Sequence, residues 1–163
     1  MNQKILKRVR ADLNNNCPMN WDCGRKCGAA CCRSDEDGQG GMYLFPGEEA
    51  LCGGDWAQIS DVMMGERQVK MLVCGGTCER SKRPLGCMIF PLTPVVNEQG
   101  KVDVRFDYRA RAMCPLLRDG VRGLRADFVS AVRSALQRIA SDKEGLAFLR
   151  DWQALEEQFD FHL

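Results

Sequence analysis

The chain is short of the features that most function classes need. It has one histidine, His162, close to the C-terminus, which argues against His-based catalysis, His-rich metal sites and a Ser-His-Asp triad. No stretch approaches the roughly 20 apolar residues of a membrane span. Lys and Arg (23) nearly balance Asp and Glu (22), for a formal net charge of +1. Nothing global therefore favours a membrane or a polyanionic partner such as nucleic acid.

Length and composition suit one globular domain. Apolar residues make up 45% of the 163 residues and charged residues 28%, and we find no repeat or linker. The N-terminal residues, MNQKILKRVRADL, carry charge throughout and lack the apolar segment of a secretory signal. We therefore expect a cytoplasmic protein in which residues 1–163 form a single cysteine-cluster metal-binding domain.

Cysteine is the abundant residue, with ten copies. In a reducing cytosol, clustered thiols more often bind metals or serve redox chemistry than form structural disulfides, which are the alternative here. Eight of them fall into two groups, one in the run CGRKCGAACC and one beginning at CGGTC. The predicted metal ligands are Cys23, Cys27, Cys31 and Cys32 from the first group, and Cys74, Cys78, Cys87 and Cys114 from the second. Cys17 and Cys52 lie outside these groups.

Clustered sulfur donors indicate zinc or an iron–sulfur cluster, since tetrahedral thiolate ligation suits both. Glycines follow Cys23, Cys27 and Cys74, where they let the chain turn tightly around a bound ion. A metal would also explain residues 14–41, where Met19 and Trp21 are the only large apolar side chains besides cysteine. Burial alone cannot offset the cost of ordering such a segment, about 1–2 kcal/mol of backbone entropy per residue.

The remaining sequence predicts an α+β fold: a cysteine-rich metal-bound layer with a small antiparallel sheet and C-terminal helices. Apolar spacing predicts an N-terminal helix over residues 3–13, a helix with a stripe from Leu124 to Ile139, and a last helix opened by a Ser141–Glu144 capping box. Alternation predicts a hairpin over 62–73, and a strand pair in which 88–90 and 95–96 lead into 102–108. A short helix is expected after Pro46, with Glu48 and Glu49 as acids of its first turn.

The cysteine pattern resembles the YkgJ-like family of zinc- or iron-chelating cysteine-cluster domains. The likeness rests on the first cysteine run, on the pair Cys74 and Cys78, on the segment RPLGCMIFP and on Cys114-Pro115, and it covers about residues 17–118. The first run is wider by one residue per gap than the family pattern, and Met88 replaces a usual arginine. The resemblance implies metal chelation. Flagellin lysine-N-methylases carry a similar cysteine set, which suggests a link to protein modification.

The sequence thus predicts a metal-binding protein that holds zinc or an iron–sulfur cluster through cysteine thiolates, with a protein partner as a possibility. The alternative is an iron–sulfur redox protein or an accessory to a methylation-type modifying enzyme. Six arginines between positions 105 and 125 could face an anion or nucleic acid. Few aromatic residues accompany them and the overall charge is near zero, so a solvated face explains them better.

Overall fold

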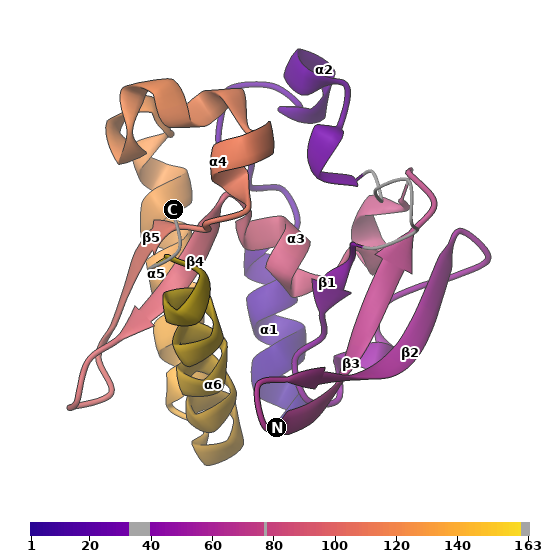
Figure 1. Cartoon of the computed structure of the whole chain (residues 1–163), viewed down its shortest axis with the longest axis vertical. Helices are drawn as coiled ribbons and strands as arrows, with labels where there is room; N and C mark the ends of the chain where they lie inside the picture. The colour runs from indigo at the N-terminus through magenta and orange to yellow at the C-terminus, as the bar shows by residue number, and fades with distance from the viewer. Residues whose placement is uncertain (33–39, 77, 161–163) are drawn as a thin grey trace.

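The computed structural model describes residues 1–32, 40–76 and 78–160. Its helices are α1 (Gln3–Leu13), α2 (Gly24–Cys27), α3 (Leu85–Ile89), α4 (Ala110–Met113), α5 (Ala126–Ala140) and α6 (Lys143–Asp160). Its strands are β1 (Met42–Tyr43), β2 (Ala57–Met64), β3 (Arg67–Cys74), β4 (Leu92–Val96) and β5 (Val102–Phe106). The predicted mixture of helices and antiparallel sheet, with helices at the C-terminal end, is confirmed (Figure 1).

The strands form two separate antiparallel sheets, where the sequence suggested one small sheet. The first has the order β1-β3-β2 and the second pairs β4 with β5. The predicted hairpin is present and longer than expected, since β2 and β3 pair from Ala57–Cys74 to Met64–Arg67 around Gly65. Gly65 has φ +61°, a conformation that glycine adopts at no steric cost.

The core lies between the long helices and the two sheets. Helix α5 buries the predicted stripe, including Phe128, Val132, Leu136 and Ile139, and packs on α1, α6 and β5. Helix α6 packs against β4 and contributes Trp152, which is 1% exposed and lies in an aromatic cluster with Phe45 and Phe148. The helical periodicity of the sequence was therefore sufficient to place these elements.

Two local predictions are wrong. The segment Met88–Phe90 is not a strand, because Leu85–Ile89 form the short helix α3 directly after Pro84. Four of the five residues of that helix are buried. A short continuous apolar run of this kind does not distinguish a helix from a strand in the sequence. The cap of α6 is Asp142 rather than Ser141: its Oδ1 accepts from the backbone N–H groups of Glu144 and Gly145, at 3.1 and 3.0 Å.

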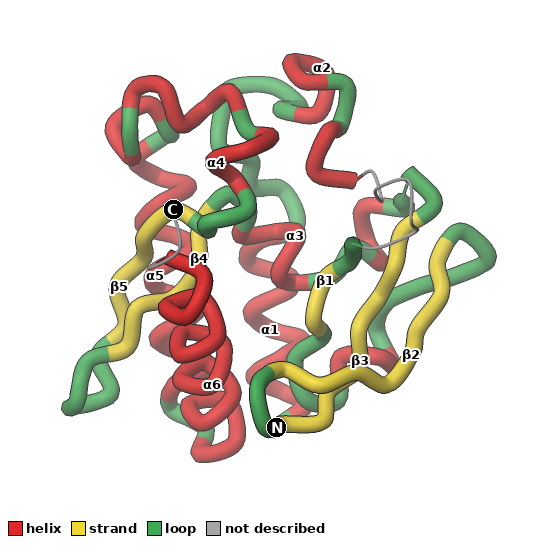
Figure 2. Tube along the Cα trace, in the orientation of Figure 1, coloured by secondary structure: helices red, strands yellow, loops and turns green. Residues whose placement is uncertain are grey.

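The cysteine-bearing segments gather at one end of the molecule. Figure 2 shows α2 and the short 3₁₀ helix η1 (Ala30–Cys32) spanning the space between α4 and the end of β3. Helix α3 lies beneath them, and the turn after β3 approaches from the side of the first sheet. Segments that are far apart in the sequence thus meet around the predicted metal ligands.

No helix in the described ranges is long and apolar enough to cross a bilayer.

Candidate metal centre

All ten cysteines are free thiols, and the eight predicted ligands lie on short or terminal pieces of structure. Cys23 precedes α2 and Cys27 ends it, while Cys31 and Cys32 lie in η1. Cys74 ends β3, Cys87 lies in α3 and Cys114 follows α4. Cys31 is exposed and the others are partly buried, so the group sits at the boundary between the core and the surface.

Four of the predicted ligands surround a first small cavity. It has a volume of about 20 Å³ and is lined by Cys23, Cys27, Cys31 and Cys114, together with prolines and apolar side chains. That volume suits about one water-sized atom. We call these four residues the first thiol group. Cys114 joins the three cysteines of α2 and η1 across a separation of more than 80 residues in sequence.

The other four surround a second cavity of about 50 Å³. Its lining includes Cys32, Cys74, Cys78 and Cys87, which we call the second thiol group, and Cys31 reaches this cavity as well. The adjacent residues Cys31 and Cys32 therefore connect the two groups. The sequence predicted the eight residues as ligands, and the structure divides them between two cavities.

Two nitrogen donors accompany the second thiol group. The Nε of Arg83 donates to the Cys78 Sγ over 3.2 Å, and Arg83 lines the same cavity. Trp56 lines it too, and its buried indole N–H has no hydrogen-bond partner in the described part of the chain. A buried N–H without a partner is costly, so this cavity suits an occupant that presents hydrogen-bond acceptors, such as metal-bound thiolates.

Burial and crowding keep most of these thiols protonated when no metal is bound. Burial, with the Cys17 thiol nearby, raises the pKa of Cys23 to about 12, and burial raises the pKa of Cys87 still further. Cys32 differs: a hydrogen bond from the Cys31 thiol, helped by the charge of Arg83, lowers its pKa to about 6. Metal binding at these sites would therefore release protons.

The thiols line common cavities without converging on a point. Within residues 1–32, 40–76 and 78–160, no group of three or more Cys, His, Asp or Glu side chains is positioned to hold a metal ion. The side chains have other partners instead: the Cys27 Sγ lies 3.8 Å from the Cys23 carbonyl oxygen, and Cys31 bonds to Cys32. The donor types and their grouping fit a metal, while the coordination geometry is not formed.

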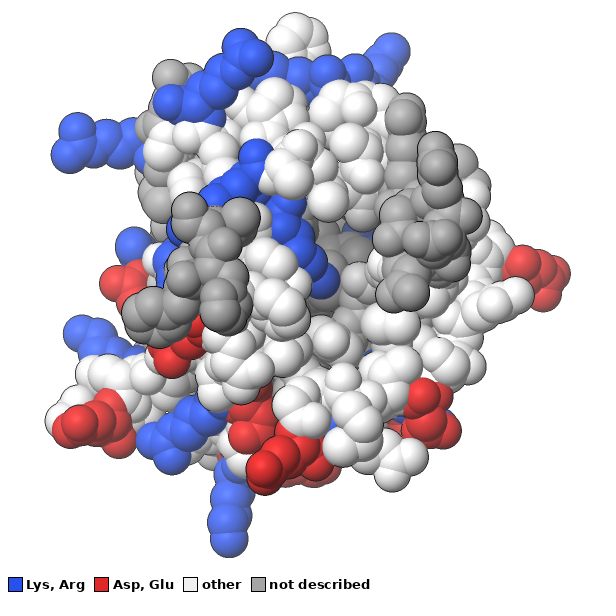
Figure 3. All heavy atoms as spheres, viewed as in Figure 1, with Lys and Arg blue, Asp and Glu red and all other residues white. Residues whose placement is uncertain are grey.

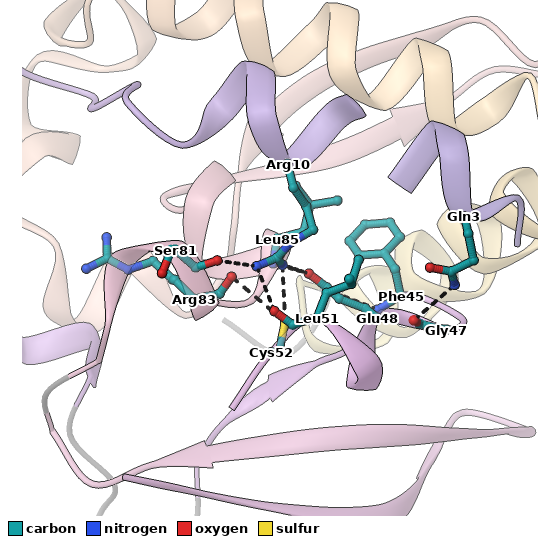
Figure 4. A network of polar contacts seen from close by, with 10 residues as sticks. All are labelled: Gln3, Arg10, Phe45, Gly47, Glu48, Leu51, Cys52, Ser81, Arg83 and Leu85. Atoms are coloured by element: carbon teal, nitrogen blue, oxygen red, sulfur yellow. Dashed lines mark hydrogen bonds and ion pairs between the residues drawn. The ribbon is translucent and has the colours of Figure 1, made fainter. Parts of the chain in front are cut away.

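A buried ion pair between Arg10 and Glu48 supports the helix that carries Cys87 of the second thiol group. Glu48 lies, as predicted, in the first turn of a short helix after Pro46, the 3₁₀ helix η2 (Glu48–Ala50), and its side chain is fully buried against Arg10 of α1 (Figure 4). Glu48 also accepts from the backbone N–H of Phe45 at 3.0 Å and of Leu85 at 2.6 Å. Leu85 begins α3, so this carboxylate fixes the start of the helix that carries Cys87.

Two further cysteines and one tryptophan were not among the predicted ligands. Cys17 bonds to the Cys23 side chain and is a potential extra ligand of the first group. Cys52 lies apart from both cavities and accepts from Arg10 at 3.1 Å. Trp21 is 72% exposed beside α2.

No family model, curated protein or solved structure matches this chain. The resemblance to YkgJ-like domains therefore stays a prediction drawn from the cysteine pattern.

Proposed function

We propose that this protein binds metal through two neighbouring centres, each held by four cysteine thiolates. The first thiol group (Cys23, Cys27, Cys31 and Cys114) would hold one centre, and the second group (Cys32, Cys74, Cys78 and Cys87) the other. The observation that carries the proposal is that eight thiols from four separate regions of the chain line two adjacent small cavities. All-sulfur donor sets of this kind suit zinc or iron–sulfur clusters.

The size of the first cavity favours a single ion there. A volume of about 20 Å³ accommodates one zinc ion, whereas an iron–sulfur cluster of several atoms would require the surrounding chain to expand. Zinc held by four thiolates has no open coordination position, so its role is structural. We therefore favour a zinc-stabilised domain, with the iron–sulfur redox or modification-accessory function as the alternative.

The proposal is tested by metal and acid-labile sulfide analysis of protein purified without oxygen, with its visible spectrum. We expect a colourless protein with about two zinc ions per chain, as two closed four-thiolate sites require. Brown protein with iron and sulfide would support the iron–sulfur alternative. Protein that contains no metal after anaerobic purification, and binds none when zinc is added, would overturn the proposal.

Arg83 provides a more local prediction. Its guanidinium donates to Cys78, and residues that support metal ligands in this way typically contribute 10–100-fold to affinity. We expect Arg83→Gln to weaken the second centre by roughly that factor and to leave the first unchanged. Competition with a chromophoric chelator measures both affinities. Lys82→Gln is the matched control, because Lys82 is exposed and pairs with Glu79 on the surface. Equal affinities in the two variants would show that Arg83 does not support the centre.

A further inference from the structure

A larger cleft of about 710 Å³ opens beside the second thiol group, and the thiolate centres do not account for it. One wall carries Cys31, Cys32, Cys78 and Cys87, and the opposite wall is formed by Tyr108, Arg109 and residues of α6. Figure 3 shows a hollow in the corresponding face of the molecule, with Lys or Arg side chains reaching toward it. The volume lies in the range of sites for small organic ligands.

The α6 wall contains a carboxylate that is nearly inaccessible to solvent and that forms no ion pair of its own with any described residue. Glu156 is 2% exposed and lines the cleft. It accepts from the Trp152 indole N–H at 3.1 Å and from the Tyr108 backbone N–H, which are both neutral donors. The nearest guanidinium belongs to Arg109, and that group bonds through its Nε and Nη2 to both oxygens of Asp107. The two buried carboxylates of Asp107 and Glu156 thus share the single positive charge of Arg109.

Two other arginines of the described ranges line the cleft. Arg83 donates to Cys78 on the opposite wall, and Arg25 lies on helix α2, which has no buried residue. An anionic ligand beside Arg109 would meet a guanidinium that already pairs with Asp107, and it would lie close to the Glu156 carboxylate. A cationic ligand would instead supply the missing charge, since a buried carboxylate without a counter-charge is strongly unfavourable.

The apolar lining fits the same kind of ligand. Four aromatic residues line the cleft, and three methionines add polarisable sulfur: these are Tyr43, Phe90, Tyr108 and Trp152, with Met42, Met71 and Met113. Aromatic faces attract organic cations, and methionine adapts its shape to varied apolar groups. A buried carboxylate beside an aromatic and methionine lining is the arrangement expected for a ligand that has a positive charge and an apolar part.

We propose that this cleft binds a small organic ammonium ion, whose charge pairs with the Glu156 carboxylate and whose apolar part lies along the aromatic wall. Binding at this position would place the ligand between α6 and the second thiol group. The inference goes beyond metal binding and does not depend on it, because the residues that carry the charge argument belong to α6 and to the turn between β5 and α4.

The pKa of Glu156 supports the assignment. Burial and the charge of Asp107 raise it to about 7, against the opposing effect of Arg109; Tyr108 and Tyr43 are the other titratable groups nearby. Glu156 is therefore half-protonated near neutral pH. Because only the carboxylate attracts a cation, binding should tighten as the pH rises through about 7 and level off above it.

The experiment titrates the protein as isolated with benzyltrimethylammonium, an aromatic cation without a titratable proton, and with phenylacetate and benzyl alcohol as the anionic and neutral counterparts. Metal content is measured separately, so that failure here is distinguishable from failure of the metal proposal. We expect saturable binding of the cation alone. Glu156→Gln should weaken that binding by at least about tenfold, the lower end of the range for a close pair of opposite charges.

Glu157→Gln is the matched control, because it removes the same charge at the neighbouring position. The Glu157 side chain accepts a hydrogen bond from Gln153 and does not line the cleft. If Glu156→Gln does not fold, ¹³C NMR of the wild-type carboxyl groups decides: the cation should lower the pKa of Glu156. No saturable binding of the cation, tighter binding of phenylacetate, or equal effects of the two variants would overturn the proposal.

Discussion

Removal of the metal is expected to disorder residues 19–32 while the helices and sheets of the body stay folded. Between residues 14 and 32 only Pro18 is buried, and Trp21 is largely exposed. The internal hydrogen bonds of this stretch are short-range, such as Ala29 N–H to the Gly24 carbonyl. Ordering costs about 1–2 kcal/mol of backbone entropy per residue, and a structural zinc supplies about 10–16 kcal/mol in small peptides.

The boundary of the disorder is set by contacts that need no metal. Arg80 donates to the backbone carbonyls of Asn14 and Asn16, at 2.6 and 2.9 Å, and the Arg125 N–H bonds to the Pro18 carbonyl at 3.0 Å. Amide hydrogen exchange, compared before and after chelation under reducing conditions, measures the change. Protection should be lost across 19–32 and kept in α5 and α6, which serve as internal controls. Unchanged protection across 24–32 would contradict the metal-ordering account.

Loss of Glu48 is expected to destabilise the fold by about 3–5 kcal/mol, the range for breaking a buried ion pair. The variant Glu48→Ala leaves the Arg10 guanidinium, which is 7% exposed, without its carboxylate. It also leaves the N–H groups of Phe45 and Leu85 without an acceptor. Because Leu85 opens the helix that carries Cys87, we expect weaker metal binding at the second centre as well.

Chemical denaturation of metal-loaded protein measures this loss. Glu49→Ala is the matched control: Glu49 is the adjacent acid, it is exposed, and surface changes of this kind usually shift stability by about 0.5 kcal/mol or less. The double variant Arg10→Met with Glu48→Gln should recover part of the loss, since it removes both charges and keeps an acceptor at position 48. A Glu48→Ala protein as stable as the Glu49→Ala protein would show that the pair does not hold the fold.

Periodicity in the sequence was enough to place the long elements. Helices α1, α5 and α6 and the hairpin of β2 and β3 follow from apolar spacing, because each presents one face to the core. Helix α3 could not be recognised, since a five-residue element that is buried nearly all round has no periodicity. The burial of Glu48 was also hidden, because its partner Arg10 is 38 residues away and only tertiary structure brings them together.

The candidate site also has features that the sequence predicts and features that only the tertiary structure reveals. The eight cysteines could be selected from their spacing, but their division into two groups depends on topology: α4 brings Cys114 to α2 and η1, while β3 and α3 bring Cys74 and Cys87 to Cys32. Arg83 flanks Cys87 in the sequence, which indicates a cation near the thiols but does not show that it contacts Cys78. Trp56 had no such signal, because a lone tryptophan near a cysteine is common in loops. The same holds for Glu156, whose burial follows from the way α6 packs against Tyr108.

The most direct test of the two-centre account is the metal content of single cysteine variants. Cys78→Ser removes a ligand of the second centre, Cys114→Ser removes one of the first, and Cys52→Ser changes a thiol outside both cavities. We predict that each of the first two proteins loses half of the metal, that their combination loses all of it, and that Cys52→Ser keeps the wild-type content. Full metal content in the double variant, or equal loss in Cys52→Ser, would contradict the account.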